Sequence, residues 1–410
     1  MEIYEVGGAV RDALLGKPVK ERDWLIVGAA PADLLKLGYR QVGKDFPVFL
    51  HPETGEEYAL ARTERKVSPG YTGFAFDTSP AITVEQDLER RDLTINAIAR
   101  DQAGRIVDPW GGRRDIAERK LRHVSDAFRE DPVRVLRTAR FAADLVELGF
   151  SVAPETERLM RDMVESGEVD ALRPERVWKE TARALGTRRP DVYVEVLRSC
   201  GALAKVFPEV DALFGVPQPA RWHPEIDTGV HVMMALRTAA GLTDDPTVAF
   251  AVLTHDLGKA TTPAEVLPKH HGHEERSVEI LLRLCERLPV PRAYRDLAVH
   301  VARYHGLVHR CDELRPATVL KLITAVDGLR RSARFDAFLL ACEADARGRK
   351  GLEERPYPQS SKLRAALEAA RGVDPAALME EGLAGPKLGA ALRRRRIDAI
   401  REVMERGSRS

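Results

Sequence analysis

The chain has 410 residues, 44% of them hydrophobic and 31% charged, and its 64 basic residues against 63 acidic ones give a net charge of +1. This composition is typical of a globular protein, and the length predicts two to four domains. The charge balance excludes a chain that is basic throughout and coats nucleic acid indiscriminately, although it leaves room for a local basic groove.

The chain has no run of about 18 apolar residues and no secretory signal at its N-terminus, so we expect a cytoplasmic protein without a membrane span. The cysteines form no CxxC pair, which predicts reduced thiols. They are Cys200, Cys285, Cys311 and Cys342.

Short β-prone runs alternate with turn and helix signals over residues 1–110, which predicts a small α/β sheet domain. The expected strands are Ile3–Val6, Trp24–Val27, Glu57–Ala61 and Arg105–Val107, and a helix is expected over Val10–Leu15.

From about residue 114 the chain becomes rich in Ala, Leu and charged residues at helical spacing. This pattern predicts helices over Pro132–Val146, Pro174–Leu185 and Ser277–Leu288. Pro and Gly clusters at residues 215–226 and 351–360 suggest boundaries within the helical part.

The turn after the first expected strand holds Gly7 and Gly8, with Arg11 near the start of the following helix. Glycines let a backbone approach a phosphate, although a plain tight turn would give the same pattern. Glu21 and Asp23 lead into the next strand, where residues two apart share a face. Two carboxylates so placed would favour a cation such as Mg²⁺, whereas the alternative is a pair of solvated charges.

Two arginine-rich segments strengthen the hypothesis of a phosphate site. Arg90 and Arg91 precede Asp92 in a stretch that then becomes apolar. Further along the chain, arginines recur every three residues after Asp131, which predicts one broad helix face. They are Arg134, Arg137 and Arg140.

Taken together, Val6–Asp12, the acidic pair, Arg62–Arg65, Arg90–Asp92 and Glu130–Arg134 resemble the bacterial-type CCA-adding enzymes. These are class II tRNA nucleotidyltransferases of the polymerase beta superfamily, in a group that also holds bacterial poly(A) polymerases. The motifs appear in family order over roughly residues 1–185.

The resemblance implies a role for each matching residue. Glu21 and Asp23 would be catalytic and hold Mg²⁺, and Glu57 could supply a third carboxylate. Nucleotide binding would fall to Gly8, Arg11, Arg91, Asp131, Arg134, Arg137 and Arg140. Among these, Asp131 and Arg134 would read the base of CTP and then of ATP, and Arg65–Phe76 would be the family's flexible loop.

One residue departs from the family pattern, which is ordinarily Asp-x-Asp, because the first member here is Glu21. Glutamate keeps the charge but moves the ligand oxygens by roughly 1 Å, which matters to an octahedral site. Glu21 is therefore either a tolerated variant or a substitution that lowers activity.

A second cluster lies in the helical part. His255 and Asp256 end an apolar helix that begins near Asp245, and seven of the eleven histidines fall within residues 231–305. A lone His-Asp pair is usually cap or surface chemistry, but this density favours a metal site.

The segment Leu253–Lys259 is similar to the signature of the HD phosphohydrolase superfamily, and residues 222–229 look like the gamma-proteobacterial CCA-adding subgroup. The resemblance implies His231, His255 and Asp256 as metal ligands, with Asp345 or His305 completing the set. It also implies a divalent transition metal, with Ni²⁺ as a candidate, and hydrolysis of phosphate esters.

The predicted fold class is α+β: a polymerase-beta-like nucleotidyltransferase head on a small mixed sheet, followed by a mainly α-helical neck, HD domain and tail. We expect the head at 1–140, the neck or RNA-binding region at 141–225, the HD domain at 226–350 and the tail at 351–410. The expected partners are tRNA, CTP and ATP, for a monomer or homodimer. Candidate RNA contacts are Arg173, Arg176, Lys179 and Arg393–Arg396.

The predicted function is addition of CCA to tRNA 3′ ends, with phosphohydrolase activity (2′,3′-cyclic phosphodiesterase, 2′-nucleotidase and phosphatase) at the HD domain. Three alternatives remain open at this point. They are a poly(A) polymerase, an HD phosphohydrolase whose head is impaired by Glu21, and a structural RNA chaperone.

Overall fold

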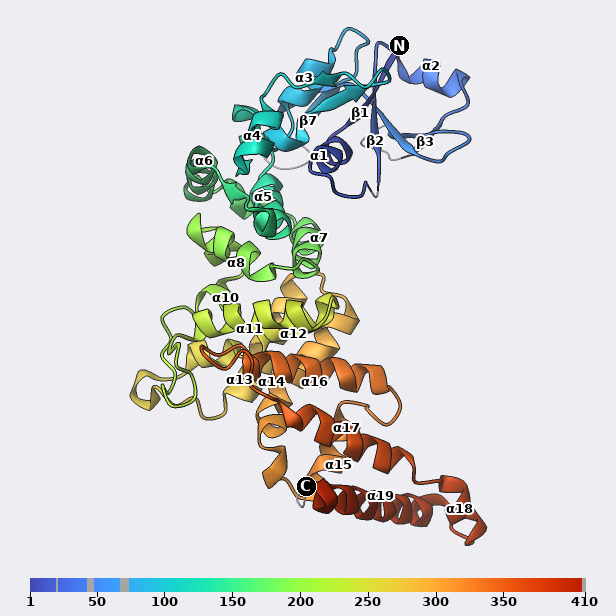
Figure 1. Ribbon diagram of the computed structural model, residues 1–410, viewed down its shortest axis with the longest axis vertical. Helices are drawn as coiled ribbons and strands as arrows, with labels where there is room; N and C mark the ends of the chain where they lie inside the picture. Colours follow the sequence, from blue (N-terminus) through green and yellow to red (C-terminus); the bar gives the residue numbers. More distant parts are fainter. Residues whose placement is uncertain (20, 43–47, 67–73, 408–410) are drawn as a thin grey trace. The chain divides into compact units, whose positions relative to one another are not determined.

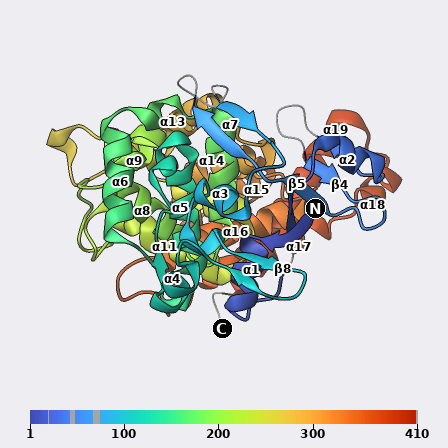
Figure 2. The ribbon, with the colours of Figure 1, turned by 90° about the horizontal axis from the view of Figure 1, so that it is seen from above.

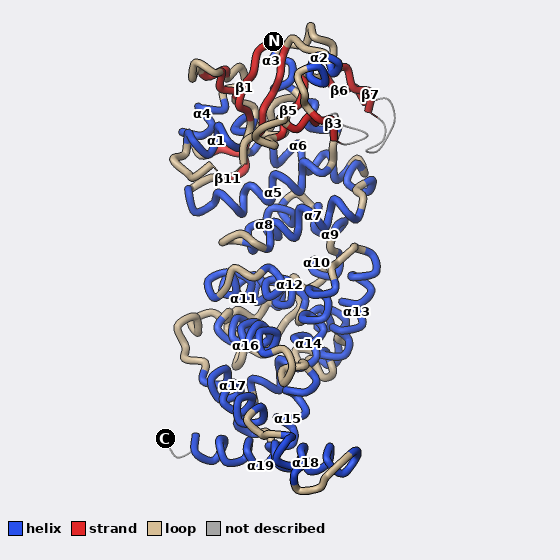
Figure 3. The backbone as a smooth tube through the Cα atoms, turned by 90° about the vertical axis from the view of Figure 1, so that its right-hand side faces the viewer, coloured by secondary structure: helices blue, strands red, loops and turns tan. Residues whose placement is uncertain are grey.

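The computed structural model describes residues 1–19, 21–42, 48–66 and 74–407. The chain divides into two compact units, Met1–Glu180 with Glu195–Lys205 and Thr181–Val194 with Val206–Ser410. Among the described residues, no helix is long and apolar enough to cross a membrane. Figure 3 shows the strands gathered in the N-terminal part, with helices making up nearly all of the remainder.

The first unit is built on a seven-stranded sheet of order β3-β4-β5-β2-β1-β8-β9. Its strands are β1 (Glu2–Val6), β2 (Asp23–Val27), β3 (Arg40–Val42), β4 (Val48–Leu50), β5 (Glu57–Leu60), β8 (Ala99–Asp101) and β9 (Ile106–Val107). The β2–β5 pair is parallel and the other pairs are antiparallel, which confirms the predicted mixed sheet.

The sheet carries a hydrophobic cluster on each face because apolar residues alternate along its strands. In β2, Leu25 belongs to the cluster that includes Leu88 of helix α3 (Val84–Glu89). Ile26 belongs to the other cluster, with Leu34 of helix α2 (Pro31–Lys36). Helix α2 lies beside the β3–β5 end of the sheet (Figures 1 and 2).

The other elements of the first unit are short apart from two helices. They are α1 (Gly8–Leu14), β6 (Thr63–Lys66), β7 (Phe74–Asp77), η1 (Thr94–Asn96), α4 (Gly112–Glu118), β10 (Lys120–Leu121), η2 (Asp126–Glu130), α5 (Val133–Leu145), η3 (Val146–Leu148), β11 (Ser151–Val152), α6 (Pro154–Glu165) and η4 (Glu168–Ala171). The helix predicted over Pro132–Val146 is α5. The predicted flexible loop Arg65–Phe76 falls largely on residues 67–73, outside the described residues.

Helices α7 (Pro174–Leu185) and α8 (Pro190–Ser199) contribute residues to both units, and α9 (Ala202–Val206) begins in the first. The second unit is helical throughout its described part. Its elements are α10 (Pro208–Asp211), α11 (Thr228–Leu242), α12 (Pro246–Thr254), η5 (Leu257–Thr261), η6 (Ala264–Val266), α13 (His273–Arg287), α14 (Arg292–His309), η7 (Cys311–Glu313), α15 (Pro316–Ala325), α16 (Ser332–Arg347), α17 (Pro358–Arg371), α18 (Pro375–Glu380) and α19 (Gly385–Gly407).

Helix α12 begins where Asp245 caps it, through a hydrogen bond that Thr247 N donates to the carboxylate, as the sequence predicted. Helix α13 begins four residues before the predicted Ser277, because Gly272 at φ 69° forms its N-cap. All four cysteines are free, which confirms the expected thiols.

Candidate functional site

The turn from β1 into α1 requires glycine at its first position. Gly7 has φ 71° and ψ −130°, a backbone conformation that residues other than glycine rarely adopt. A Cβ atom there would lie 3.0 Å from Nη1 of Arg91, whereas one on Gly8 would lie 3.6 Å from Nη2 of Arg11. Two guanidinium groups therefore lie against the backbone of this turn, which favours an anion.

The predicted carboxylate pair is arranged differently from the expectation. Strand β2 begins at Asp23, so Glu21 precedes it and the argument from strand alternation was wrong for this residue. Asp23 instead has Glu57 as its register partner across the parallel β2–β5 pair, which places the two residues side by side on one face. Both side chains are exposed, as is that of Glu21.

Three arginines of the predicted nucleotide site surround one aromatic ring. The guanidinium carbons of Arg140, Arg11 and Arg137 lie 4.2, 5.2 and 5.5 Å from the ring centroid of Phe141. Such contacts are favourable because the face of an aromatic ring is electronegative. The sequence analysis did not assign Phe141 a role, since only the fold shows that a residue far from Arg11 packs beneath it.

Each of these arginines is also held by a polar partner. Arg11 donates to Oδ1 of Asn96 at 2.7 Å, Arg137 to Oδ2 of Asp92 at 2.7 Å, and Arg140 to Oε2 of Glu180 at 2.6 Å. These partners lie 85, 45 and 40 residues away along the chain. The cluster is thus oriented in advance by contacts from two segments, residues 92–96 and Glu180.

Two buried aspartates provide the charge that orients this site. Asp87 accepts hydrogen bonds from both Arg90 and Arg91. Burial alone would raise the pKa of Asp87, but the two guanidinium groups hold that pKa below its usual value. The pKa of Asp92 is likewise held low against its burial, chiefly by Arg137 with help from Asn96. Both carboxylates therefore remain charged.

Asp131 and Arg134, the predicted base readers, have protein partners in this structure. The Asp131 carboxylate accepts hydrogen bonds from both terminal nitrogens of Arg176, at 2.8 and 2.7 Å, and one from Val133 N, the first residue of α5, at 3.1 Å. Arg134 donates to the carbonyl oxygens of Ala127 and Arg90, at 2.6 and 2.5 Å. Base reading by Asp131 and Arg134 stays a prediction. Arg176, which contacts Asp131, also belongs to this site.

The second unit gathers the predicted HD residues at one buried centre. His231 comes from α11, Asp345 from α16, and His255 with Asp256 from the end of α12. Nε2 of His231 lies 2.9 Å from Oδ1 of Asp345, and Nε2 of His255 lies 3.1 Å from Oδ2 of Asp256. Ligating atoms of His231, His255 and Asp256 all lie within 4.8 Å of one another.

His305 reaches the same centre, so both candidates for the remaining ligand are present. A ligating atom of His305 lies within 4.8 Å of ligating atoms of His255 and Asp345. In a second group it lies equally close to ligating atoms of Asp256 and His273. Nε2 of His273 lies 3.3 Å from Oδ1 of Asp256, and Nε2 of His305 lies 3.8 Å from it. His273 received no role in the sequence analysis.

Backbone carbonyls set the tautomers of three of these histidines. The Nδ1 atoms of His255, His273 and His305 lie 2.7, 2.8 and 2.9 Å from the carbonyl oxygens of Val252, His270 and Val301. A carbonyl oxygen can only accept, so each Nδ1 carries a hydrogen. In the neutral ring the Nε2 lone pair then faces the carboxylates, an arrangement that favours a cation between them.

Unpaired buried atoms support this interpretation. Both carboxylate oxygens of Asp256 and the Nε2 atoms of His255 and His273 are buried without an aligned hydrogen bond. Such groups are costly unless something else satisfies them. The side chains of His255, Asp256 and His273 therefore fit a divalent metal ion.

The electrostatics point the same way. Burial lowers the pKa of His255, but Asp256 and Asp345 outweigh it and raise that pKa to about 10. Burial and the charge of His255 lower the pKa of His305 to about 3, so His305 stays neutral. A field that attracts a proton this strongly also attracts a metal ion.

Several supporting residues were not predicted from the sequence. Oε1 of Glu225 lies 3.1 Å from Nδ1 of both His223 and His231. Nε2 of His309 lies 2.6 Å from Oδ2 of Asp345, and Nδ1 of His309 lies 2.9 Å from the hydroxyl of Tyr357. Carboxylates and hydroxyls that orient histidines are common around metal ligands.

Two cations complete the site. Nζ of Lys259 lies 2.6 Å from Oδ2 of Asp256, and Nη2 of Arg349 lies 3.5 Å from Oδ1 of Asp345. Lys259 belongs to the quoted HD signature, so the sequence contained that signal, whereas nothing in the sequence marked Arg349. Both positive charges therefore lie beside carboxylates of this cluster.

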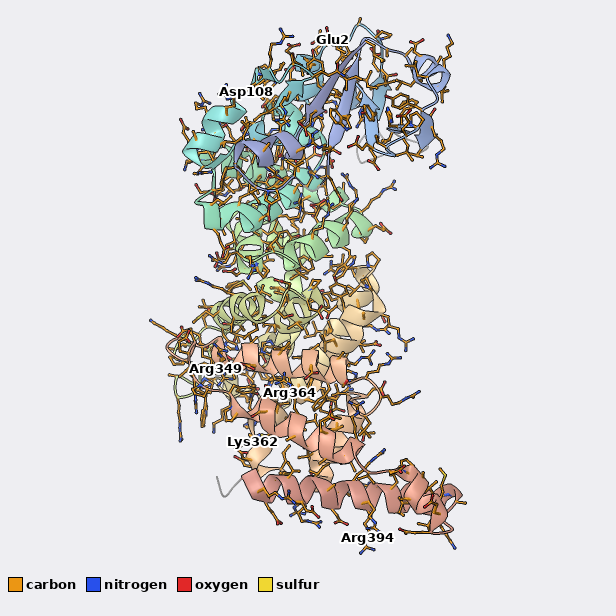
Figure 4. The ribbon with its side chains drawn as sticks, turned by 45° about the vertical axis from the view of Figure 1, so that its right-hand side comes forward. Glu2, Asp108, Arg349, Lys362, Arg364 and Arg394 are labelled. Atoms are coloured by element: carbon orange, nitrogen blue, oxygen red, sulfur yellow. The ribbon has the colours of Figure 1, made fainter. Side chains whose placement is uncertain are left out.

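The predicted RNA contacts differ in their surroundings. Arg173 and Lys179 are exposed on or beside α7, whereas Arg176 binds Asp131. In the arginine run, Arg394 is exposed and extends away from α19 (Figure 4), but Arg396 donates to Ala370 O. Their contact with RNA stays a prediction.

Comparison with known families divides the chain in three. Residues 3–122 match the poly A polymerase head domain, and residues 228–331 match the HD domain. Residues 149–214 match a family described as the probable RNA and SrmB-binding site of polymerase A.

Curated relatives match over nearly the whole chain. The multifunctional CCA protein of Thioalkalivibrio sulfidiphilus is 62% identical over 98% of each chain. That of Nitrosococcus oceani is 60% identical over 99% of this chain and 100% of its own. Among solved structures, the Thermotoga maritima CCA-adding enzyme complexed with tRNA has the same fold, with a TM-score of 0.63 and 20% identity over 98% of this chain and 91% of its own.

Proposed function

The chain belongs to the family of multifunctional CCA proteins, and on that premise we propose that it adds C, C and A to tRNA 3′ ends from CTP and ATP. The observation that carries the proposal is 62% identity to such a protein over 98% of both chains. The cytoplasm would be the site of action, with the head at 1–140, neck at 141–225, HD domain at 226–350 and tail at 351–410.

In the head, the triphosphate would lie against the Gly7–Gly8 turn. Arg91 is held there by Asp87 and Arg11 by Asn96, so neither side chain has to be reoriented when the anion arrives. Such preorganisation contributes to catalysis because the ordering cost is met during folding.

The remaining arginines would close the nucleotide pocket. Arg137 and Arg140 flank Phe141 and would contact the nucleotide from the side of α5. Asp131 and Arg134 would read the base, and Arg176, which lies against the Asp131 carboxylate, would hold that carboxylate in position. The base preference would therefore come from an aspartate–arginine pair rather than from a nucleic-acid template.

The chemical step is attack of the RNA 3′-hydroxyl on the α-phosphate, with pyrophosphate as the leaving group. Mg²⁺ bound at Glu21 and Asp23 would supply activation of the hydroxyl and stabilisation of the leaving group. Glu57 lies beside Asp23 in register and would add a third carboxylate to the same face. Arg91 and Arg11 would neutralise the charge that develops on the departing phosphates.

The HD centre would hydrolyse phosphate esters, including 2′,3′-cyclic phosphodiesters and 2′-phosphates. His231, His255, Asp256 and Asp345 would hold one divalent transition metal, for which Ni²⁺ is a candidate. Asp256 through Oδ1, with His273 and His305, would form a second ligand set. A bound metal would supply activated water, and Lys259 and Arg349 would hold the phosphate.

An incorporation assay tests the head. The protein is incubated with tRNA lacking its terminal triplet and with CTP, ATP or both. Sequential addition of C, C and A is expected, and Asp23→Ala should abolish it. Extension by ATP alone with no use of CTP would identify a poly(A) polymerase instead, and extension by the Asp23→Ala variant would refute the assignment of the head site.

The same assay resolves the role of Glu21. Glu21→Asp restores the usual family carboxylate, and equal activity of the two proteins would show that Glu21 is a tolerated variant. An inactive wild type with an active Glu21→Asp variant would support the impaired-head alternative. Hydrolysis of adenosine 2′,3′-cyclic phosphate, lost in Asp256→Ala, tests the HD centre separately.

A further inference from the structure

The segment that leads into α11 reverses the usual burial of polar and apolar side chains. His223 and His231 are buried, and the Glu225 side chain is only 2% exposed. In the same segment, Trp222, Ile226 and Val230 are 57%, 49% and 43% exposed. Large apolar side chains that stay exposed beside buried polar ones make this segment a candidate binding surface.

Ile226 strengthens the case that this arrangement serves a purpose. Its φ of 62° is an unusual value for a β-branched residue, and the backbone on both sides is held in place. Gln218 N donates to Ile226 O at 2.7 Å, and Ile226 N donates to His223 O at 2.9 Å. The segment is therefore constrained to keep its apolar side chains outward.

Trp222 is connected to the metal centre through a single side chain. Nη1 of Arg349 donates to the carbonyl oxygen of Trp222 at 3.3 Å, and Nη2 of the same group lies 3.5 Å from Oδ1 of Asp345. The Nε atom of Arg349 is buried without a hydrogen-bond partner. One guanidinium group thus joins the main chain at Trp222 to a carboxylate of the HD centre.

The indole of Trp222 has a cation over its ring and is otherwise largely open. The guanidinium carbon of Arg221 lies 4.8 Å from the ring centroid of Trp222, over one face. The tryptophan nevertheless stays 57% exposed, so ring surface remains open to a ligand. Aromatic side chains stack on nucleobases of any kind, because every base has a π face.

We propose that Trp222 is the base-stacking platform of the HD centre, which gives that centre a preference for nucleoside phosphates over simple alkyl phosphates. The phosphate would lie at the metal cluster beside Arg349, and the base would stack on the indole. The ligand is a nucleoside carrying a 2′-phosphate or 2′,3′-cyclic phosphate, either free or at an RNA 3′ end. This inference rests on the proposed phosphohydrolase activity.

The test compares two secondary phosphate monoesters that differ in the base. Adenosine 2′-phosphate has one, and glycerol 2-phosphate does not. Trp222→Ala should raise KM for adenosine 2′-phosphate about tenfold, since stacking contributes about that factor or more, with kcat unchanged. Hydrolysis of glycerol 2-phosphate should not change, and Trp222→Phe should keep most of the nucleotide preference.

A binding measurement without turnover accompanies the kinetics. Adenosine should quench tryptophan fluorescence of the wild type but not of Trp222→Phe, because the other three tryptophans are buried or half-buried. An oligonucleotide ending in a 2′,3′-cyclic phosphate, compared with the free cyclic nucleotide, shows which source is preferred. Both sources should lose affinity in Trp222→Ala.

The possible outcomes distinguish a failure of the Trp222 proposal from a failure of the proposed phosphohydrolase activity. If the wild type hydrolyses both monoesters with the same KM, the HD activity stands and the platform is refuted. An equal loss on both substrates in Trp222→Ala would also refute it, because that result indicates damage to the centre. If the wild type hydrolyses neither, the proposed HD activity itself fails.

Discussion

Replacing Gly7 by alanine should destabilise the first unit, and the structure allows the cost to be worked out. The new residue would be held at φ 71° and ψ −130°, and its Cβ would lie 3.0 Å from Nη1 of Arg91. Backbone strain of this kind costs about 1–3 kcal/mol. A loss of about 2 kcal/mol lowers the ratio of folded to unfolded protein roughly 30-fold.

Gly8→Ala provides the matched control one residue along the chain. Gly8 does not have a positive φ, and its added Cβ would meet Arg11 only at an ordinary contact distance of 3.6 Å. Alanine also suits a helix better than glycine by about 0.5–1 kcal/mol. This variant should keep its stability but bind CTP more weakly, because a methyl group would lie where a phosphate approaches the backbone.

The assay is urea denaturation followed by tryptophan fluorescence in a Trp222→Phe background. The remaining tryptophans are Trp24, Trp110 and Trp178, all in the first unit, so the signal reports on that unit. A Gly7→Ala variant that unfolds at the same urea concentration as its parent would refute the reasoning. Loss of stability in Gly8→Ala would contradict the control.

Three further predictions concern buried charge and metal. Asp92→Asn should destabilise the first unit by about 3 kcal/mol in urea denaturation at pH 7, because Arg137 loses its buried partner. The folded-state pKa of Asp92 is lowered, so its contribution is complete above an unfolded pKa of about 3.9. The difference between variant and wild type should therefore shrink as pH falls below that value, and a constant difference would contradict the assignment. His273→Ala should remove one of two equivalents of tightly bound Ni²⁺ per chain, measured by mass spectrometry, whereas the exposed neighbour variant His271→Ala should keep both. Chelation should lower the melting temperature of the second unit in calorimetry by an amount that depends on metal concentration, and an unchanged temperature would argue against a bound ion there.

Local patterns in the sequence were sufficient for the fold class and for several residues that the fold brings together in the second unit. Helical periodicity and the cap at Asp245 located α5, α7 and α12 within a residue or so. His255 and Asp256 could be singled out because they are neighbours in the sequence, and the fold brings His231 to within 4.8 Å of their ligating atoms.

Contacts between distant segments were not predictable in this way. Arg176 meets Asp131 across 45 positions, and Glu225 meets His231 only because the preceding loop folds back. The strand argument for Glu21 failed because β2 begins two residues later. In each case the tertiary fold, rather than local propensity, decides which groups meet.

The lysine beside the HD carboxylate has a consequence for how the protein is made. Lys259 places its ammonium group 2.6 Å from Asp256, so the acidic centre carries a positive charge of its own. Small zinc domains, by contrast, fold only once their ion has bound. Because this charge offsets that of the buried carboxylate, we expect a newly synthesised chain to fold before a metal ion binds.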